Sequence, residues 1–171
     1  MRHLILAALF VPFTFAYGTL PAQRQSRLRL FNTHTLEHLD VVYSRDGVYD
    51  QEALAKLDLF LRDWRVDSVK HYDPRLFDLL AELTDKVKQP GAEIHIICGY
   101  RTPKTNKQLR SRSSAVGGNS LHMKAEAIDI RLPGVRTSRL RDTALALKRG
   151  GVGYYAGSDF VHVDIGRVRR W

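Results

Sequence analysis

The sequence predicts a single α+β domain in which helices pack against a small, mainly antiparallel sheet. The first observation is the order of patterns along the chain: a hairpin, two helices, a strand, a helix, a strand, a helix and a second hairpin. The second is size, because 171 residues without a short leader make about one domain. The third is composition, since 44% hydrophobic and 26% charged residues are typical of a globular protein. We find no internal repeat and no second domain boundary.

The first half of the chain contains the expected hairpin and two helices. Apolar residues alternate on both sides of "NTHT" between residues 27 and 43, which predicts a β-hairpin. Residues 51–63 place leucines at helical spacing, which predicts a helix. A second helix is expected where Asp73 can act as N-cap and Pro74 can take the first helical position.

The second half alternates strands with helices. "AEIHIICGY" predicts a strand, and "TPKTNKQLRSR" predicts a helix capped by Thr102. A loop rich in glycine and serine leads to the strand "AEAIDIRL". The next helix is expected to use Thr137 or Ser138 as its cap and Gly150 as its stop. "VGYY" and "FVHVDI" predict two short strands, and the tight connection "AGSD" between them favours a hairpin.

The N-terminus has the pattern of a secretory signal. Arg2 and His3 precede an apolar run from residue 4 to residue 16, and small residues follow it. We expect a signal peptide over residues 1–18, possibly to 22, and one globular domain over residues 25–171. The chain would then be exported to the periplasm or cell envelope. The alternative is an uncleaved anchor, and membrane contact is expected only through this segment.

A net charge of +9 suits a polyanionic partner. Behind a signal peptide, the polyanions within reach are the cell wall and the membrane surface, so we expect no nucleic-acid partner. A solvated basic face without a partner is an equally good explanation. We expect a monomer. The basic residues concentrate in the second half of the chain: Lys104, Lys107, Arg110, Arg112, Arg131, Arg136, Arg139, Arg141, Arg167, Arg169 and Arg170.

The chain has one cysteine, Cys98, which cannot form an internal disulfide. It lies in the apolar run "EIHIICGY", and a small buried residue is the favoured interpretation. A catalytic cysteine is the weaker one, because no activating histidine is evident beside it in the sequence.

Histidine and aspartate occur where core strands are expected. Asp129 lies between two isoleucines and His162 between two valines, so each side chain should point away from its apolar neighbours. If the two strands are neighbours, these residues and His122 can converge. Two histidines and one carboxylate form a zinc set that leaves a fourth position for water, and zinc lowers the pKa of that water to about 7. Spacing alone leaves ordinary hydrogen-bonded histidines as the alternative.

Longer strings resemble a known superfamily. "SLHMKAEAID" resembles the Ser-x-His-x-x-Gly-x-Ala-x-Asp motif of zinc peptidases of the D-Ala-D-Ala carboxypeptidase and VanX type, a superfamily that includes the hedgehog domain. Together with "GYRTPKTN", "GGVGYY" and "FVHVDIGRVRRW", it is similar to the YcbK-like, or MepK-like, murein endopeptidases over about residues 25–171. The resemblance implies a hedgehog/D-Ala-D-Ala-peptidase-like fold and cleavage of peptide cross-links in peptidoglycan.

The resemblance also implies roles for individual residues. Zn²⁺ would be bound by His122, Asp129 and His162. Arg101 would face the scissile carbonyl or a substrate carboxylate, and Ser120 would lie near the substrate. Asp159, three residues before His162, would be the general base. With Asp164, the competing candidate described next, the candidate site residues are Arg101, Ser120, His122, Asp129, Asp159, His162 and Asp164.

Asp164 is the competing candidate for the base. It follows His162 by two residues on the same strand face, which suits a residue that hydrogen-bonds a ligand from behind. We favour Asp159 as base, because a turn residue can fold back over the open coordination position. The alternative for Asp159 is a turn-forming role.

One position departs from the motif, since Ala125 replaces its glycine. If the position needs a positive φ, alanine strains the loop; if it needs only a small side chain, the change is nearly silent. All three expected ligands are present, so we expect a zinc-dependent murein endopeptidase. The alternative is a non-catalytic, zinc-containing cell-wall-binding module of the same fold.

Overall fold

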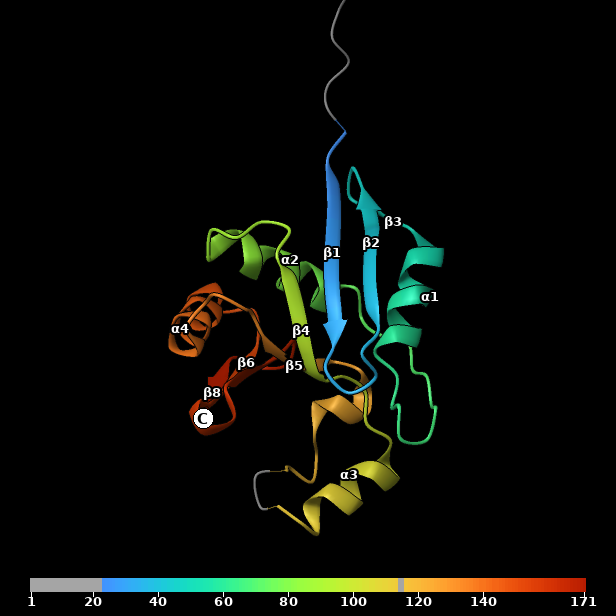
Figure 1. The fold of residues 1–171 in the computed structure, drawn as a ribbon, viewed down its shortest axis with the longest axis vertical. Helices are drawn as coiled ribbons and strands as arrows, with labels where there is room; N and C mark the ends of the chain where they lie inside the picture. Colours follow the sequence, from blue (N-terminus) through green and yellow to red (C-terminus); the bar gives the residue numbers. More distant parts are fainter. Residues whose placement is uncertain (1–22, 114–115) are drawn as a thin grey trace, which may run out of the picture.

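A computed structural model describes residues 23–113 and 116–171 of the chain (Figure 1). The predicted signal peptide lies outside these residues. Within the described part, no helix is long and apolar enough to cross a membrane. The elements in chain order are β1 Gln25–Asn32, β2 His38–Arg45, β3 Val48–Tyr49, α1 Gln51–Phe60, α2 Arg75–Lys86, β4 Glu93–Cys98, α3 Pro103–Arg110, the 3₁₀ helix η1 Leu121–Lys124, β5 Ala127–Arg131, α4 Thr137–Leu147, β6 Gly151–Tyr155, the 3₁₀ helix η2 Ala156–Ser158, β7 Phe160–Asp164 and β8 Arg169–Arg170.

The strands form one eight-stranded sheet in the order β3-β2-β1-β4-β5-β7-β6-β8. The pairs β1–β4 and β6–β8 are parallel and the other neighbours are antiparallel, as the sequence predicts. Both expected hairpins are present, as β1–β2 and β6–β7. The α+β class is therefore confirmed. The sheet contains more strands than the two hairpins and two single strands that the sequence predicts.

Alternation along the strands separates the two faces of the sheet. Leu28 and Leu30 of β1 are buried. So are the pairs Ile94/Ile96 of β4, Ile128/Ile130 of β5 and Val161/Val163 of β7. These side chains join the apolar residues of α1, α2 and α4 in one core, and the three helices flank the sheet in Figure 1. Residues between these positions, including Asp129, must therefore point to the opposite face.

Both ends of helix α4 differ from the sequence prediction. Helix α4 begins at Thr137 with Arg136 as N-cap and no side-chain cap, because the Thr137 hydroxyl donates to Asp159 instead. It ends at Lys148 in a left-handed conformation, two residues before Gly150. The prediction of a threonine or serine cap and a glycine stop was wrong. Thr102 caps α3 through Thr105 N–H, as predicted. Helix α2 begins at Arg75, one residue later than predicted, so its N-cap is Pro74 and not Asp73, although Asp73 still accepts from Arg75 N–H.

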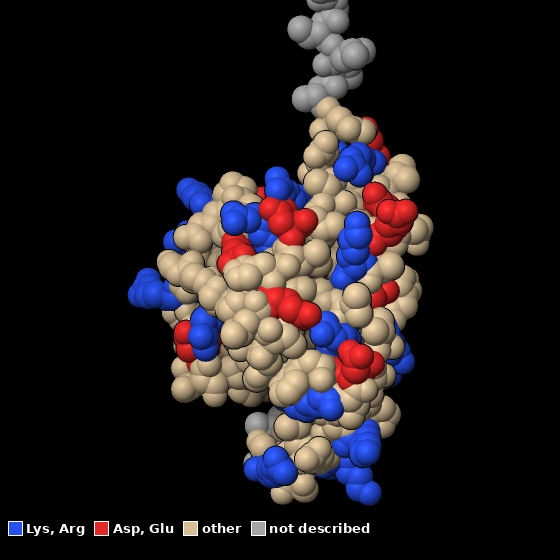
Figure 2. All heavy atoms as spheres, turned by 45° about the vertical axis from the view of Figure 1, so that its right-hand side comes forward, with Lys and Arg blue, Asp and Glu red and all other residues tan. Residues whose placement is uncertain are grey.

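Helix α3 projects from the sheet at the end opposite the start of β1, at the bottom of Figure 1. This end of the molecule shows basic side chains and no acidic ones on the face drawn in Figure 2. Many other arginines are paired with carboxylates, including Arg27 with Asp40 and Arg149 with Glu82. Within the described ranges, no ion pair is recorded for the four basic residues on and after α3: Lys104, Lys107, Arg110 and Arg112.

Candidate metal centre

The register of two central strands brings Asp129 and His162 together. Strands β5 and β7 are antiparallel neighbours in which Asp129 lies directly opposite His162, and Ile128 lies opposite Val163. Side chains opposite each other on one face have Cβ atoms about 4.5–5.5 Å apart. The pattern that buries the isoleucines and valines thus places a carboxylate and an imidazole side by side on the other face.

His122 reaches the same point from the short helix η1. The Ser120 hydroxyl accepts from His122 N–H at 3.4 Å and caps this helix. The turn ends at Ala125, whose φ of 58° is left-handed and returns the chain into β5. The His122 ring is held from behind, because its Nδ1 donates to the Gly99 carbonyl at 2.8 Å. That bond leaves Nε2 as the nitrogen that faces the cluster.

Three candidate ligand atoms meet within a small volume. His122 Nε2 lies 3.2 Å from Asp129 Oδ1 and 3.1 Å from His162 Nδ1, and His162 Nδ1 lies 2.8 Å from Asp129 Oδ1. A tetrahedral zinc ion with bonds of about 2.0–2.2 Å holds neighbouring N and O ligands roughly 3.3–3.5 Å apart. The set therefore fits zinc after a small expansion, and its chemistry, two imidazoles and one carboxylate, is one that zinc uses.

Burial and charge shift the pKa values of this cluster. Burial alone would lower the pKa of His122, but the charges and hydrogen bonds of Asp129 and Cys98 together outweigh it and raise the pKa to about 10. Burial would raise the pKa of Asp129, but the adjacent His122 and His162 lower it well below its usual range. The metal-free cluster is thus an ion-paired, strongly polar site within an apolar sheet.

Asp164 contacts His162 from the side away from the cluster. Its carboxylate accepts from His162 Nε2 at 3.1 Å, from Gly151 N–H at 2.8 Å and from Arg169 Nη2 at 2.7 Å. Its side chain is fully buried. Burial would raise the pKa of Asp164, but the hydrogen bonds from His162, Arg169 and backbone N–H groups lower it well below its usual range. Such a carboxylate fixes the ring orientation and leaves Nδ1 toward the cluster.

The cluster opens into a cavity of about 470 Å³. Arg101 lines it, is 8% exposed, and donates from Nη2 to the Ser120 hydroxyl at 3.0 Å. Its Nε has no hydrogen-bond partner among the residues that the structure describes. A buried guanidinium with a free donor beside a metal set is suited to bind a carboxylate or an oxyanion. The lining also contains three aromatic side chains, Tyr155, Phe160 and Trp171.

The sequence matches the family described as peptidoglycan L,D-endopeptidase MepK, Peptidase_M15_2, over residues 20–171. This chain belongs to that family. It is 41% identical to the peptidoglycan L,D-endopeptidase MepK of Escherichia coli K12 over 168 residues, which are 97% of this chain and 90% of the relative. It is also 41% identical to the probable peptidoglycan L,D-endopeptidase MepK of Haemophilus influenzae, over 82% of this chain and 75% of the relative. Among solved structures, no significant match was found.

The structure does not bring every residue implied by the MepK resemblance into the cluster. Asp159 lies in the β6–β7 turn with φ 51°, and its side chain is 59% exposed. Its carboxylate pairs with Arg131 Nε at 2.9 Å and accepts from Thr137. The neighbouring turn residues Ser158 and Phe160 line the cavity, whereas Asp159 does not. The turn is therefore adjacent to the site, with its carboxylate held on the side of Arg131.

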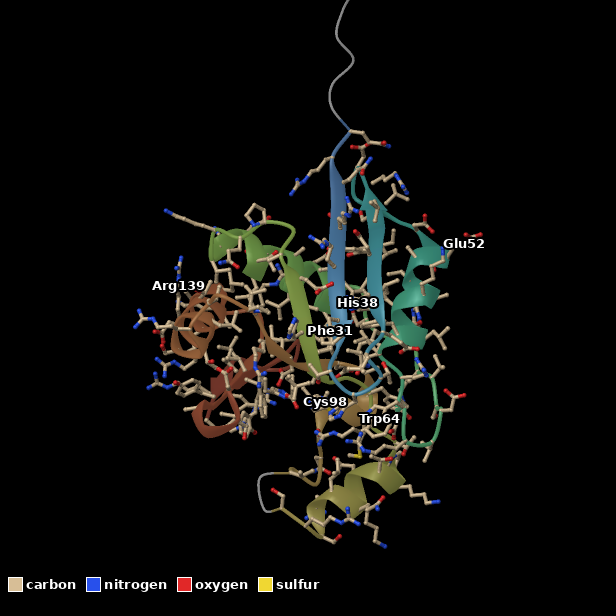
Figure 3. All side chains as sticks on the ribbon, viewed as in Figure 1. Phe31, His38, Glu52, Trp64, Cys98 and Arg139 are labelled. Atoms are coloured by element: carbon tan, nitrogen blue, oxygen red, sulfur yellow. The ribbon has the colours of Figure 1, made fainter. Side chains whose placement is uncertain are left out.

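One residue near the MepK-like centre was not predicted there from the sequence. Cys98 was expected in the core, yet it is only half-buried and lies opposite Asp129 at the end of β4, where Figure 3 labels it. The register shifts between Ile96 and Cys98, so a β-bulge turns the cysteine off the core face. Plain alternation from Ile94 and Ile96 could not reveal this, because a bulge adds one residue to the count.

Proposed function

We propose that this protein is a zinc metallopeptidase that hydrolyses peptide cross-links of peptidoglycan, at L,D-bonds as the names of its relatives describe. Family membership supports the reaction class. The observation that carries the proposal for this chain is the meeting of His122, Asp129 and His162 within 3.2 Å at the base of a cavity that Arg101 lines.

The metal would be held by His122 Nε2, Asp129 Oδ1 and His162 Nδ1. Zinc bound there supplies a Lewis acid and an activated water at neutral pH. Asp164 and the Gly99 carbonyl keep the two imidazoles oriented, since each accepts a hydrogen bond from the ring nitrogen that faces away from the cluster.

Arg101 would act on the charge of the substrate. Its guanidinium is buried, is fixed by Ser120, and carries a donor that is unpaired among the described residues. Peptidoglycan stem peptides carry free carboxylates, and the oxygen of the scissile carbonyl becomes negative during attack by water. A fixed guanidinium stabilises either charge, which supports a role for Arg101 and Ser120 in substrate binding and for Arg101 in catalysis.

Asp159 remains our proposal for the general base. Asp164 is fully buried and accepts hydrogen bonds from four residues, whereas Asp159 is largely exposed and lies between two residues of the cavity wall. Catalytic hydrogen bonds often form only when the substrate is bound, so the ion pair with Arg131 is compatible with this role. Asp159→Asn and Asp164→Asn, each scored for zinc content and cleavage, decide it. An active Asp159→Asn beside a folded, zinc-loaded and inactive Asp164→Asn would reverse the assignment.

The location follows from the substrate class and the N-terminal pattern. We propose that residues 1–18, possibly to 22, direct export to the periplasm or cell envelope and are removed. The mature protein would begin between Thr19 and Gln23. N-terminal sequencing of the native protein tests this, and an intact Met1 in a soluble cytoplasmic fraction would overturn it.

The decisive experiment is digestion of purified muropeptides, with products read by mass. We expect cleavage that a chelator abolishes and zinc restores. His122→Ala and His162→Ala should lose both zinc and activity. Arg101→Ala should retain zinc and lose about 10²–10³-fold in rate. His38→Ala is the matched control, because this histidine is exposed, contacts Glu93 and the Phe31 ring, and does not line the cavity.

The second candidate is a wall-binding module that holds zinc without catalysis. The presence of Arg101 and of an exposed acid in the adjacent turn favours the enzyme. Binding to isolated cell-wall sacculi with one zinc per chain but no release of fragments would favour the module.

A further inference from the structure

Cys98 and two proposed ligands form a potential donor set of their own. One ligand atom from each of Cys98, His122 and Asp129 lies within 4.8 Å of the others. The β-bulge sets Cys98 opposite Asp129, as described above. The next residue, Gly99, supplies the carbonyl that accepts from His122 Nδ1. The end of β4 therefore contacts the centre through both the thiol and the backbone.

The sulfur interacts with one of the proposed ligands. It hydrogen-bonds the His122 side chain, and its other recorded contact is a 3.6 Å hydrogen bond to the carbonyl of its own neighbour, Gly99, which is weak for a thiol donor. The side chain is half-buried at the end of the central strand β4, where it also borders a small cavity beside Trp64 and Tyr100. Cys98 is not a member of the apolar core cluster.

We propose that Cys98 is a fourth protein ligand of the metal centre, which can then be closed as a two-histidine, one-aspartate, one-cysteine site. This rests on the proposed function, because it assumes the same zinc. Thiolate is a strong zinc ligand, with a bond of about 2.3 Å. On one tetrahedral zinc, a sulfur ligand lies about 3.6 Å from each nitrogen or oxygen ligand. Rotation about the Cα–Cβ bond of Cys98 can move the sulfur toward this distance without moving β4.

Coordination by Cys98 has a functional consequence. Catalytic zinc sites keep one position open, whereas sites with four protein ligands are closed and structural. The state with sulfur bound would hold zinc tightly and be latent, and release of the sulfur would open the position that hydrolysis needs. Cys98 would thus set both the retention of metal and the fraction of active protein.

Cobalt substitution provides the direct test. We expect the Co²⁺-loaded full chain to show a sulfur-to-cobalt charge-transfer band that Cys98→Ser and Cys98→Ala lack. Both variants should bind zinc at least about tenfold more weakly in competition with a chromogenic chelator. A wild-type spectrum without this band, or equal zinc affinity in all three proteins, would overturn the proposal.

Alkylation gives an independent measurement, because the chain contains one cysteine. Iodoacetamide labelling followed by mass should slow at least about tenfold when zinc is added, since a coordinated thiolate is withheld from the reagent. His122→Ala should show no such protection. Equal labelling rates with and without zinc would contradict sulfur coordination.

These outcomes separate the inference from the function on which it rests. If Cys98→Ser binds zinc as the wild type does while His122→Ala does not, the three-ligand centre and the peptidase stand and the fourth ligand is wrong. If His122→Ala also keeps its zinc, both assignments fall. Circular dichroism of each variant excludes loss of the fold as the cause.

Discussion

Ala125 has a backbone conformation that glycine adopts at lower cost. Its φ is 58° and its ψ is 39°, and its side chain is completely buried. A left-handed conformation costs a residue with a Cβ about 1–2 kcal/mol. The motif glycine that Ala125 replaces is thus explained by backbone geometry, and the substitution strains the loop that carries His122.

We predict that Ala125→Gly changes the free energy of unfolding by less than about 1 kcal/mol. Relief of the left-handed strain is offset by loss of a buried methyl group, about 0.8 kcal/mol, and by greater freedom of the unfolded chain, about 0.4–1 kcal/mol. Ala125→Val should instead cost more than about 2 kcal/mol, because a β-branched residue is strongly disfavoured at this φ and overfills the core. Urea denaturation measures both, and a large gain from glycine would contradict the balance.

The raised pKa of His122 predicts a pH dependence of metal binding. At pH 7 the ring is protonated in the metal-free protein, because its pKa is about 10, and zinc requires the neutral ring. Binding should release about one proton from His122, and affinity should rise about tenfold per pH unit between pH 7 and 8.5. Calorimetry in buffers of different ionisation enthalpy counts the proton. Affinity that stays flat over this range would show that the pKa is not raised.

The same shift affects the stability of the metal-free fold. The pKa of His122 is higher in the folded chain, about 10, than its ordinary value of 6.5, so the folded state binds more protons between these values. The contribution to stability is complete below pH 6.5 and is lost as the pH rises toward 10.

At this scale, sequence alone could place some site residues and not others. Asp129 and His162 each stand alone between buried apolar residues, so strand alternation assigns them one face correctly. The position of Asp159 depends on which partner its side chain takes, Arg131 and Thr137, and these lie 28 and 22 residues away. Nothing in a one-dimensional pattern specifies such a choice.

Among the elements, β6 is shaped by its glycines. A Cβ at Gly151 would lie 2.5 Å from Asp164 Oδ2 and would also meet Arg169, and one at Gly153 would lie 2.7 Å from the Trp171 indole. The glycines of "GGVGYY" therefore allow neighbouring side chains to approach the strand closely. They let the buried carboxylate behind His162 and the aromatic lining of the cavity lie directly against the strand.

We predict that Gly151→Ala weakens zinc binding, although residue 151 is not a proposed ligand. The methyl group would push Asp164 from His162, so zinc affinity should fall about 10–100-fold and stability by about 1–3 kcal/mol. Zinc competition and urea denaturation measure the two effects. Gly157→Ala is the control, because a Cβ there meets nothing within 4 Å. Equal zinc affinity in both variants would show that Asp164 does not orient His162.

The elements themselves followed from the sequence where local rules decide. Both hairpins and all four helices were expected, because apolar period and capping residues specify them. The exceptions, the cap of α4 and the bulge before Cys98, arise from tertiary contacts: Thr137 is drawn to Asp159, and β4 must match the register of β5. Local propensity yields to such contacts at the ends of elements.

For the whole molecule, part of the positive charge behind the net charge of +9 lies at one end. Several arginines elsewhere pair with carboxylates, including Arg27 of β1, Arg75 of α2 and Arg141 of α4. No ion pair is recorded among the described residues for the basic end on and after α3 (Figure 2), which consists of Lys104, Lys107, Arg110 and Arg112. This end adjoins the cavity through the loop that contains Gly117 and Asn119. A polyanionic wall would therefore meet the molecule on the side of its site.

We predict that binding to isolated sacculi weakens with salt. Exposed charges are screened over about 8 Å at physiological ionic strength, so affinity should fall several-fold between about 50 and 300 mM salt. The double substitution Lys104→Gln, Lys107→Gln should reduce binding and the salt slope while zinc content stays unchanged. Lys56→Gln, exposed on α1, is the control. Binding that is insensitive to both salt and the double substitution would leave the basic end without this partner.

The proposed ligands also join parts of the chain that are far apart in sequence. His122 comes from the 3₁₀ helix η1, Asp129 from β5 and His162 from β7, 40 residues beyond the first histidine. An ion bound to all three would fasten this half of the sheet together and would be lost when it opens. At a free zinc concentration 100 times the dissociation constant, such linkage adds about 2.7 kcal/mol to the folded state. If the protein is exported as proposed, its survival among the proteases of the envelope would follow the local supply of zinc, so that a metal-starved cell would lose the hydrolase by degradation as well as by inactivity.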